Sequence, residues 1–470
     1  MRPEQRVTTY GVSVMVGLTL LVVTGLTFLI DPMAQDLQLP NTTVELALVA
    51  PSIAALLVVF VAGRAGDRFG ERKTIIAAGV VFTLGAGVLA SASFDPAVIV
   101  GLAMCGAGSV VVQVVALSLL KRTTPDGKAR VQAFTTFGMV FPVAFLVFPI
   151  GTSLLLGLVN WRWIPVIWSV CGVVVVVISL LLLNRDRQGT AEGEWASPIL
   201  AGIALATGSR MLQEISRDQG NPIIIGMTAT FCAVATVACV LVMKRAKHPG
   251  LSVRPLGGAM VRPLLFGIAI LSLIQILTYI SIALEYFYDM TPLEASLAIA
   301  PAQVGAIFGA KVVASRAIQA WGISRSGRSL LLLTGLVMLL LVFVQAGTPV
   351  WYLVLVATAF SLTGMAALTV MNLDIMGRAP EGAAGIVSSF RTAASSLGAA
   401  MSMVVLGVAV LSSVSLAGGS NNVSETQLEE LAAALRVDGV IGCVIAAVGW
   451  AVLYVTGRRD RADHTVGASA

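Results

Sequence analysis

Long apolar runs constrain the fold of this chain more than any other feature of its sequence. A helix that crosses a hydrocarbon core needs roughly 20 apolar residues, and about fourteen stretches of the chain reach that length. Hydrophobic residues make up 57% of the 470 residues and charged residues 11%, whereas soluble domains carry about 25% charge. The runs are continuous, as at Val173–Val177, and lack the alternation of membrane barrel strands. We expect an all-α polytopic membrane protein with spans at 9–30, 44–63, 75–93, 97–120, 132–156, 164–184, 197–215, 222–243, 263–285, 292–311, 329–346, 350–373, 385–412 and 439–457.

The distribution of positive charge predicts the orientation of the chain. Cytoplasmic connections of membrane proteins carry an excess of Lys and Arg. Most of the 30 Lys and Arg fall at the two termini or in the connections on the same side as the termini. The exceptions are Arg162, Arg210, Arg217 and Arg436 in the other connections, and Arg391 inside a span. We therefore expect a multi-pass protein of a bacterial plasma membrane with both termini in the cytoplasm. The net charge of +6 reflects this topology, so we expect contact with membrane lipids and no nucleic-acid partner.

The spans form two blocks of six around a shorter pair. Residues 1–184 are expected to form an N-terminal six-helix bundle, 185–262 an inserted helix pair with cytoplasmic linkers, and 263–470 a C-terminal six-helix bundle. Both blocks have a charged connection between their second and third spans, at 64–74 and 312–328. Pseudo-symmetric halves of this kind are typical of secondary transporters, in which the substrate binds between the halves. We expect the protein to be a monomer.

The longest outer connection, 413–438, carries an acidic run from Glu425 to Leu435. Its composition predicts a short surface helix, with a lid for a substrate or a partner as the alternative. The last span is expected to begin after this connection, at residue 439.

The most specific motif lies in the connection after the second span, which reads GRAGDRFGERK from Gly63 to Lys73. This run resembles the signature G-x-x-x-D-R-x-G-x-R-K of the major facilitator superfamily, at the expected place. Glycines permit a tight turn and close helix contact, and Asp67 can accept hydrogen bonds from the N-terminus of a neighbouring helix. The resemblance implies a cytoplasmic latch that holds one gating state, and a solvated charge cluster is the alternative. The residues of this gating motif are Gly63, Gly66, Asp67, Arg68, Gly70, Arg72 and Lys73.

A second motif, Trp161-Arg162-Trp163, lies in the outer connection before the sixth span. A W-R-W-I run at this place is similar to that of the fourteen-span drug:proton antiporter branch of the superfamily. Aromatic rings suit the bilayer interface, and Arg162 can stack between them or bind a carboxylate. An interfacial anchor and a substrate contact both remain open. Further matches to this branch are Ala246–Pro249, Thr291–Ala295 and Gly382–Gly398.

Departures from the branch fall on the residues that the branch uses for proton coupling. The branch has an aspartate in the middle of its first span, where this chain has Val23, and an arginine in its fourth span, where this chain has Leu102. In its fifth span the branch carries G-P-x-x-G-G, whereas residues 148–153 of this chain read FPIGTS. Pro149 is expected to bend that helix, while the glycine packing surface is reduced. The second-half copy of the signature, within 310–324, lacks the aspartate.

No acidic residue lies at the middle of a predicted span. Asp31 and Glu285 end spans one and nine, which occupy equivalent positions in the two halves. Arg391 lies well inside a span, and Asp374 ends the preceding span on the same side. An ion pair between Asp374 and Arg391 would lower the cost of burying both charges, as a static pair or as one that opens with the gate. These four residues are the candidate coupling groups.

Two amides lie deep in predicted spans, Gln113 in the fourth and Gln275 in the ninth. They are the candidate substrate-binding residues. A mostly apolar cavity with a few amides suits a small amphipathic or lipid-like substrate.

The sequence favours a transporter over an enzyme. The five cysteines lie in spans without metal-ligand spacing, and His248 and His464 are the only histidines. We therefore expect no metal, no cofactor and no catalytic residue. The leading hypothesis is a secondary exporter of hydrophobic or amphipathic molecules that works by alternating access and is proton-coupled if Asp31 or Glu285 titrates. The alternatives are an uncoupled carrier of a lipid or cell-envelope precursor, and a non-transporting membrane partner with the same fold.

Overall fold

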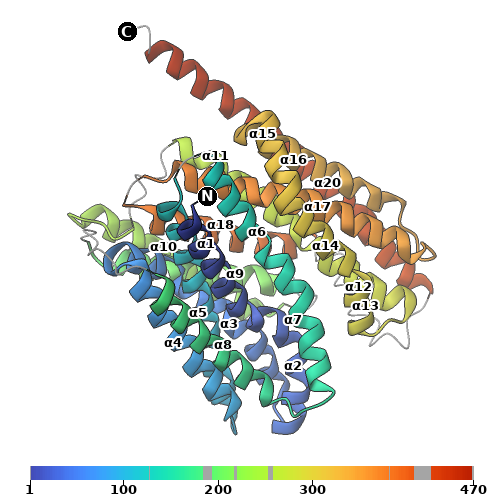
Figure 1. The fold of residues 1–470 in the computed structure, drawn as a ribbon. Helices are drawn as coiled ribbons and strands as arrows, with labels where there is room; N and C mark the ends of the chain where they lie inside the picture. Colours follow the sequence, from blue (N-terminus) through green and yellow to red (C-terminus); the bar gives the residue numbers. More distant parts are fainter. Residues whose placement is uncertain are drawn as a thin grey trace. The chain divides into compact units, whose positions relative to one another are not determined.

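A computed structural model describes residues 2–125, 127–183, 193–215, 220–251, 258–380, 382–406 and 425–467. These residues form helices joined by short connections, and no strand occurs among them (Figure 1). Twelve of the helical segments in the described residues are long and apolar enough to cross a membrane. The predicted all-α polytopic membrane fold is confirmed, but the count of fourteen spans is not. Two predicted spans correspond to α9 (Ala196–Ile215) and α18 (Ala384–Val405), which are helices outside those twelve.

The helices follow one another along the chain in two similar series. The first series is α1 (Pro3–Thr19), α2 (Leu21–Leu37), α3 (Asn41–Phe69), α4 (Glu71–Ala90), α5 (Asp95–Thr123), α6 (Lys128–Gly138), α7 (Val140–Leu156) and α8 (Trp163–Leu182). Helices α9 and α10 (Pro222–Arg245) come next. The second series is α11 (Gly258–Ile274), α12 (Ile276–Tyr288), α13 (Pro292–Ala298), α14 (Ala300–Phe308), η2 (Gly309–Val313), α15 (Ala314–Trp321), α16 (Ile323–Met338), η3 (Leu339–Phe343), α17 (Val350–Arg378), α18 and α20 (Glu425–Gly467).

The chain divides into two compact units. Unit 1 comprises Met1–Arg210, Met227–Pro255 and Ala379–Ala393, and unit 2 comprises Met211–Gly226, Leu256–Arg378 and Ala394–Ala470. The first turns of α18 thus belong to unit 1 and the rest of that helix to unit 2. The predicted division at residues 184 and 262 stays a prediction.

The two units repeat one packing scheme. In unit 1, α5 packs against α1, α3 and α4, and α8 packs against α1 and α4. In unit 2, α17 packs against α11, α14 and α16, and α20 packs against α11 and α16. Small residues permit the equivalent crossings: a Cβ on Gly172 of α8 would lie 2.3 Å from the Thr83 hydroxyl of α4, and a Cβ on Gly335 of α16 would lie 2.2 Å from the Ala446 Cβ of α20. Each unit is therefore one copy of a shared helical design.

Four of the long segments are interrupted. The breaks lie at Leu20 between α1 and α2, Met139 between α6 and α7, Gln275 between α11 and α12, and Ile299 between α13 and α14. Proline follows closely after two of these breaks, as Pro142 and Pro301. A proline offers no N–H to the carbonyl four residues earlier, which explains the interruption there.

The last helix differs from its prediction. Residues Glu425–Leu435 are not a separate surface helix, because α20 runs without a break from Glu425 to Gly467. Asp438 lies inside this helix and is fully buried. The sequence pattern could not reveal this, because the charged residues at 425–438 lower the hydropathy of the first turns while one face of them packs inside unit 2.

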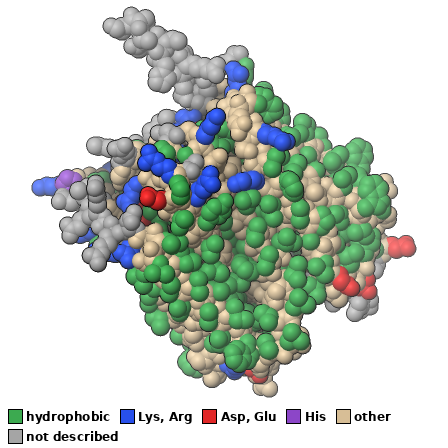
Figure 2. Space-filling view, in the orientation of Figure 1, with side chains coloured by type: hydrophobic (Ala, Val, Ile, Leu, Met, Phe, Trp, Pro, Cys, Tyr) green, Lys and Arg blue, Asp and Glu red, His purple; other side chains and the backbone are tan. Residues whose placement is uncertain are grey.

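Apolar side chains cover the flanks of the helices (Figure 2). Many are exposed, among them Leu181, Ile223 and Phe231. Lys and Arg side chains stand in the last turns of α3, α5, α10 and α17. A surface of this kind suits lipid around the helices and water at their ends.

Candidate functional site

Asp67, in the last turn of α3, binds the N-terminus of α18. Its Oδ1 accepts a hydrogen bond from the backbone N–H of Gly385 at 2.9 Å, and its Oδ2 accepts one from Ile386 at 3.1 Å. N–H groups in the first turn of a helix have no acceptor within the helix, and the helix dipole favours a negative charge there. The carboxylate therefore caps α18 with two charge-assisted hydrogen bonds. We use the name latch for Gly63 and Asp67 together with Gly385, Ile386 and Ser389.

Helices α3 and α18 meet backbone to backbone at the latch. A Cβ on Gly63 would lie 2.2 Å from both the Gly385 carbonyl oxygen and the Ser389 hydroxyl. A Cβ on Gly385 would lie 2.3 Å from the Gly63 carbonyl oxygen. The Ser389 hydroxyl donates to the Val59 carbonyl oxygen at 2.7 Å. Only glycine at 63 and 385 leaves room for this approach.

Helix α5 holds the same segment from a second side. The Ser388 hydroxyl donates to the Val114 carbonyl oxygen at 2.7 Å, and the Lys121 ammonium donates to the Ala379 carbonyl oxygen. The rings of Phe60 and Phe390 pack edge to face with centroids 5.1 Å apart. Residues 379–393 are thus fastened by α3 and α5 together.

The remaining motif residues organise the turn between α3 and α4, which we name the latch turn; the end of unit 1 where it lies is the latch end. Gly70 has φ +94°, a conformation that glycine adopts without strain. Arg72 donates from Nη2 to the Leu180 carbonyl oxygen at 2.9 Å and from Nε to the Ser179 carbonyl oxygen at 3.3 Å, so it binds the C-terminal end of α8. Gly66 faces Val115 at ordinary contact distance, and Lys73 is exposed.

A buried acid completes this end of unit 1. The Glu71 side chain, only 6% exposed, forms an ion pair of 2.5 Å with Arg122 at the end of α5. The pair joins the first residue of α4 to the last turn of α5, directly beside the latch turn.

Arg64, at a variable position of the signature, has a structural role that the sequence did not reveal. Its side chain is buried, and Nη1 donates to the Gly250 carbonyl oxygen at 3.1 Å. Its guanidinium lies 5.2 Å from the ring centre of Trp195, which also stacks on Phe69. Arg64 therefore attaches the connections before α9 and after α10 to the latch turn. The long aliphatic part of the side chain is what makes such burial feasible.

Glu194 ties these two connections together. It accepts hydrogen bonds from the backbone N–H of Ser197 at 2.7 Å and of Gly250 at 2.9 Å, and from the Ser197 hydroxyl. Burial raises the pKa of this carboxyl, but the hydrogen bonds from Ser197 and Gly250 outweigh it, so the pKa lies below its ordinary value. Glu194 is thus an ionised clasp between residues 194–197 and 250.

The aromatic motif forms a cluster at the opposite end of unit 1. The Trp161 indole N–H donates to Asp36 at 2.9 Å, and Arg162 pairs with the same carboxylate at 3.3 Å while its guanidinium lies 4.6 Å from the Trp161 ring centre. Arg162 also donates to the Ala92 carbonyl oxygen at 2.7 Å, just after α4 ends. Trp163 is exposed. Trp161 and Arg162 join the ends of α2, α4 and α8, and Trp163 alone has the exposure of an interfacial anchor.

Pro149 lies within α7, which is continuous from Val140 to Leu156. The small residue at the crossing of α7 with α2 stands on the other helix. A Cβ on Gly25 of α2 would lie 3.2 Å from the Thr152 hydroxyl and 3.2 Å from Trp168. Gly25 therefore supplies the close approach that the reduced glycine surface of α7 does not.

The candidate coupling residues lie in different surroundings. Asp31 is exposed, Glu285 is half-buried, and Arg391 is buried. Asp374 forms an ion pair with Arg378, one turn along α17, at 2.8 Å. The predicted partnership of Asp374 with Arg391 would join the two units and stays a prediction.

The two candidate amides lie close to helix interruptions. Gln113 donates to the Ser109 hydroxyl at 3.1 Å, and that hydroxyl donates to the Thr19 carbonyl oxygen at 3.0 Å, beside the break at Leu20. Gln275 is itself the break between α11 and α12. Their role in substrate binding stays a prediction.

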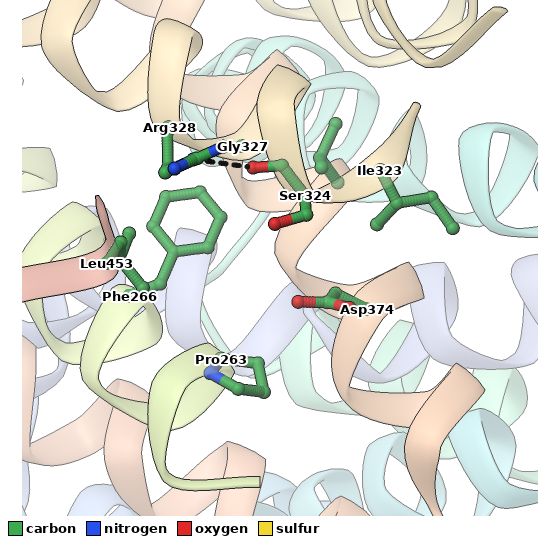
Figure 3. A pocket seen from close by; sticks show the side chains of 9 residues that line it. Pro263, Phe266, Ile323, Ser324, Gly327, Arg328, Asp374 and Leu453 are labelled. Carbon is green, nitrogen blue, oxygen red and sulfur yellow. Dashed lines mark hydrogen bonds between the residues drawn. The ribbon is translucent and has the colours of Figure 1, made fainter. Parts of the chain in front are cut away.

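Unit 2 contains a small pocket beside the turn that corresponds to the latch turn. It is formed by α11, α16, α17 and α20 (Figure 3). The Asp374 carboxylate points into it, and across from it Arg328 donates to the Ser324 carbonyl oxygen at 3.3 Å. The residues that line the pocket are Pro263, Phe266, Ile323, Ser324, Gly327, Arg328, Val370, Asp374 and Leu453.

Comparisons with known proteins agree with this architecture. The chain is 24% identical to a puromycin resistance protein of Streptomyces alboniger, over 98% of this chain and 94% of that protein. It is 24% identical to a multidrug efflux pump of Mycolicibacterium smegmatis, over 82% of this chain and 76% of the pump. The crystal structure of a human organic anion transporter shares the fold with a TM-score of 0.67 at 14% identity, covering 96% of this chain and 100% of that one.

The sequence profile of the Major Facilitator Superfamily matches residues 12–403. That span includes the latch on α3 and α18, the aromatic motif and most of both helical series. Its members are transporters and not enzymes. The chain belongs to the Major Facilitator Superfamily.

Proposed function

We propose that this protein is a secondary exporter of hydrophobic or amphipathic small molecules that works by alternating access in a bacterial plasma membrane. The observation that carries the proposal is the capping of α18 by Asp67. The resistance and efflux names of full-length relatives support export as the direction of transport.

The latch is suited to control a gate because it holds only part of a helix. Residues 384–393 of α18 belong to unit 1, whereas the helix continues into unit 2 from Ala394. A hydrogen bond to a charged group contributes about 1.5–3 kcal/mol. Two such bonds give a conformational preference of a few kcal/mol, which a substrate or a proton can shift by binding one state more tightly.

Proton coupling is the finer part of the proposal. Asp31 and Glu285 are the candidate groups from the ends of the first and ninth segments.

A second candidate function is an uncoupled carrier of a lipid or envelope precursor. It is favoured by Val23 and Leu102, apolar residues where the drug:proton antiporter branch carries an aspartate and an arginine. A non-transporting partner has little use for the Asp67 cap, which argues against that reading.

The charge distribution of unit 1 supports cytoplasmic termini. The latch end of this unit carries Arg64, Arg72, Lys121 and Arg122, whose contacts are described above, and Arg68, whose guanidinium lies 5.6 Å from the ring centre of Trp195. The other end carries Asp36 and Asp95 beside Arg162 and Thr43. By the positive-inside rule the latch end faces the cytoplasm.

Single cysteines placed near Arg2 and at Asn160 test this orientation. An impermeant thiol reagent added to intact cells should label position 160 and leave the N-terminal position unlabelled.

The function is tested by transport of ethidium, a hydrophobic cation, in proteoliposomes with and without an imposed pH gradient. Wild type is compared with Asp31→Asn and Glu285→Gln. Movement of ethidium that depends on the gradient and is lost in either variant supports a proton-coupled exporter. Movement of ethidium that ignores the gradient points to an uncoupled carrier, and no movement of ethidium or of fluorescent phospholipids contradicts the proposal.

A further inference from the structure

Asp438 is the most unusual ionisable group in the described part of unit 2. Its side chain is 0% exposed, and neither carboxylate oxygen has a hydrogen-bond partner. The hydroxyl of Tyr279 on α12 is also buried without a partner. The two lie close enough for a charge on Asp438 to act on that hydroxyl. Buried polar groups are normally hydrogen-bonded, so these two unsatisfied groups on helices that pack together need an explanation.

The equivalent position in unit 1 is apolar. Gly172 of α8 and Ala446 of α20 occupy the same crossing in the two units, against Thr83 and Gly335 respectively. Eight residues before each crossing residue stand Ile164 and Asp438. The match extends to the rare outer arginines Arg162 and Arg436, each two residues earlier.

Ile164 is buried in the apolar core of unit 1, so packing alone is satisfied there by a hydrocarbon side chain. The repeated fold does not require a carboxyl at this site. A carboxyl that replaces a core residue is therefore better explained by function than by packing.

Among the side chains that the structure describes, none forms an ion pair with Asp438. Helix α16 and η3 approach the adjacent Gly439 with Met338, Leu341 and Val342. Arg436, the nearest arginine along α20, pairs with Glu429 at 3.5 Å. Among described side chains, α11 and η3 carry no ionisable group. The other ionisable groups on the helices packed against this site, and on α20 itself, are Glu285, Tyr286, Tyr288, Arg325, Arg328, Glu425, Glu429, Glu430, Arg436, Cys443 and Tyr454.

A carboxylate without a countercharge is costly to bury, whereas the neutral acid is not. No hydrogen bond joins Asp438 to Tyr279 in this structure, and the neutral acid leaves no uncompensated charge acting on that buried hydroxyl. The packing of unit 2 in this state therefore suits the protonated acid.

We propose that Asp438 is a proton-binding site of unit 2. This inference rests on the proposed exporter function and names the group that couples it to protons. A proton from water binds one carboxylate oxygen and neutralises the acid. It leaves to water, with Asp438 becoming an anion, when the transport cycle opens the site to the opposite side. One proton enters and one leaves, and no other bond changes.

The protonation state can be measured without any substrate. Infrared difference spectra between wild type and Asp438→Asn in liposomes at neutral pH should contain the C=O stretching band of a protonated carboxylic acid. The band should shift in Tyr279→Phe, because removal of the buried Tyr279 hydroxyl lowers the polarity around the acid. Absence of the acid band at neutral pH would mean that Asp438 is ionised and would overturn the inference.

Transport of ethidium in proteoliposomes then tests the coupling. Asp438→Asn should lose at least tenfold of the gradient-driven rate while it keeps exchange of ethidium at equal pH, and Asp438→Glu should recover part of the driven rate. The matched control is Asp289→Asn, an exposed acid of the same unit in a left-handed turn that asparagine tolerates. Full gradient dependence in Asp438→Asn would refute the coupling role. A wild type that moves ethidium without a gradient response, yet shows the acid band, would place the failure in the proposed function and leave the proton site in place.

Discussion

The turn between α3 and α4 in unit 1 and the turn between α15 and α16 in unit 2 share a backbone but differ in what they bind. Gly70 and Gly322 both have positive φ, at +94° and +74°, immediately before a helix begins. Superposing the sequences on these glycines places Gln319 at the position of Asp67 and Arg316 at that of Arg64. Gln319 and Arg316 are exposed, whereas Arg64 is buried and Asp67 caps α18. The turn is therefore a property of the repeated fold, whereas in the described part of the chain the latch contacts occur in unit 1 alone.

The neighbourhoods of the two turns differ in the same way. Glu71 opens α4 and pairs with Arg122 at the end of α5. The corresponding residues of unit 2 are Ile323 and Asp374, which line a pocket instead of forming a pair with each other. At this end, an ion pair joins α4 to α5 in unit 1, whereas a small pocket lies between the corresponding helices of unit 2.

The largest difference in transport between matched variants of the two units is expected at Gly63, where α3 approaches α18 most closely. Gly63→Val would place a Cβ 2.2 Å from the Gly385 carbonyl oxygen, so the first turns of α18 must move away. We expect loss of ethidium transport by at least a hundredfold. Ser315→Val at the matching position of unit 2 should keep transport within about threefold of wild type, since overpacking of a half-buried site costs little. Equal losses in the two variants would show that unit 1 has no special role.

Removal of the latch charge should have the next largest effect. Asp67→Asn keeps the shape but weakens two charge-assisted hydrogen bonds by about 1.5–2 kcal/mol in total, so gating-dependent transport should fall about tenfold. Gln319→Asn in unit 2 is the matched control and should transport normally. The measurement is the initial rate of ethidium movement in proteoliposomes. A normal rate in Asp67→Asn would remove the latch from the transport cycle.

Removal of the ion pair next to each turn should lower stability more in unit 1 than in unit 2. Arg122→Met leaves Glu71 almost fully buried without this partner, and the free energy of unfolding should fall by about 2 kcal/mol. Arg378→Met leaves Asp374 beside an open pocket, and the loss should be at most about 1 kcal/mol. Thermal melting in detergent measures both. If Arg378→Met proves the more damaging, this contrast between the two units is mistaken.

The shared backbone predicts a change that affects both units alike. Gly70→Ala and Gly322→Ala each put a Cβ on a positive-φ, extended backbone that is essentially restricted to glycine, at a cost of about 1–3 kcal/mol. We expect melting temperatures to fall by similar amounts. Transport should suffer more in Gly70→Ala, because only that turn carries Asp67.

The smallest effect is expected at Glu194, whose hydrogen bonds join residues 194–197 to Gly250 in unit 1. Glu194→Gln should lower the free energy of unfolding by about 1 kcal/mol at neutral pH, because a neutral amide accepts weaker hydrogen bonds than the carboxylate. The folded pKa of Glu194 lies below its ordinary value, so this stabilisation is present above the ordinary value of about 4.3. It is lost as pH falls through the lower folded pKa. Melting curves of both proteins should therefore converge in acid and separate at neutral pH. A difference that grows as the pH falls would contradict the ionised clasp.

Much of the fold was predictable because the length of the apolar runs follows directly from the order of residues along the chain. The signature at Gly63–Lys73 also located the turn that carries the latch. The partners of Asp67 were not predictable, since Gly385 and Ile386 are more than three hundred residues away and contribute only backbone N–H groups. The role of Arg64 was not predictable, because it stands at a variable position of the signature. The burial of Asp438 was not predictable either, because the acidic residues in the first turns of α20 lower the hydropathy there and one face of these turns is buried only in the folded unit.

The central claim is that release of α18 from α3 is a step of transport. Cysteines at Val59 and Ser389, whose carbonyl and hydroxyl oxygens lie 2.7 Å apart, can fix the two helices together in a variant with the five native cysteines replaced. After cross-linking with a short bifunctional thiol reagent that is cleavable by reduction, ethidium transport in proteoliposomes should stop, and reduction should restore it. Transport at the full rate by the cross-linked protein would contradict the account, because the latch would then be a fixed contact and not a gate.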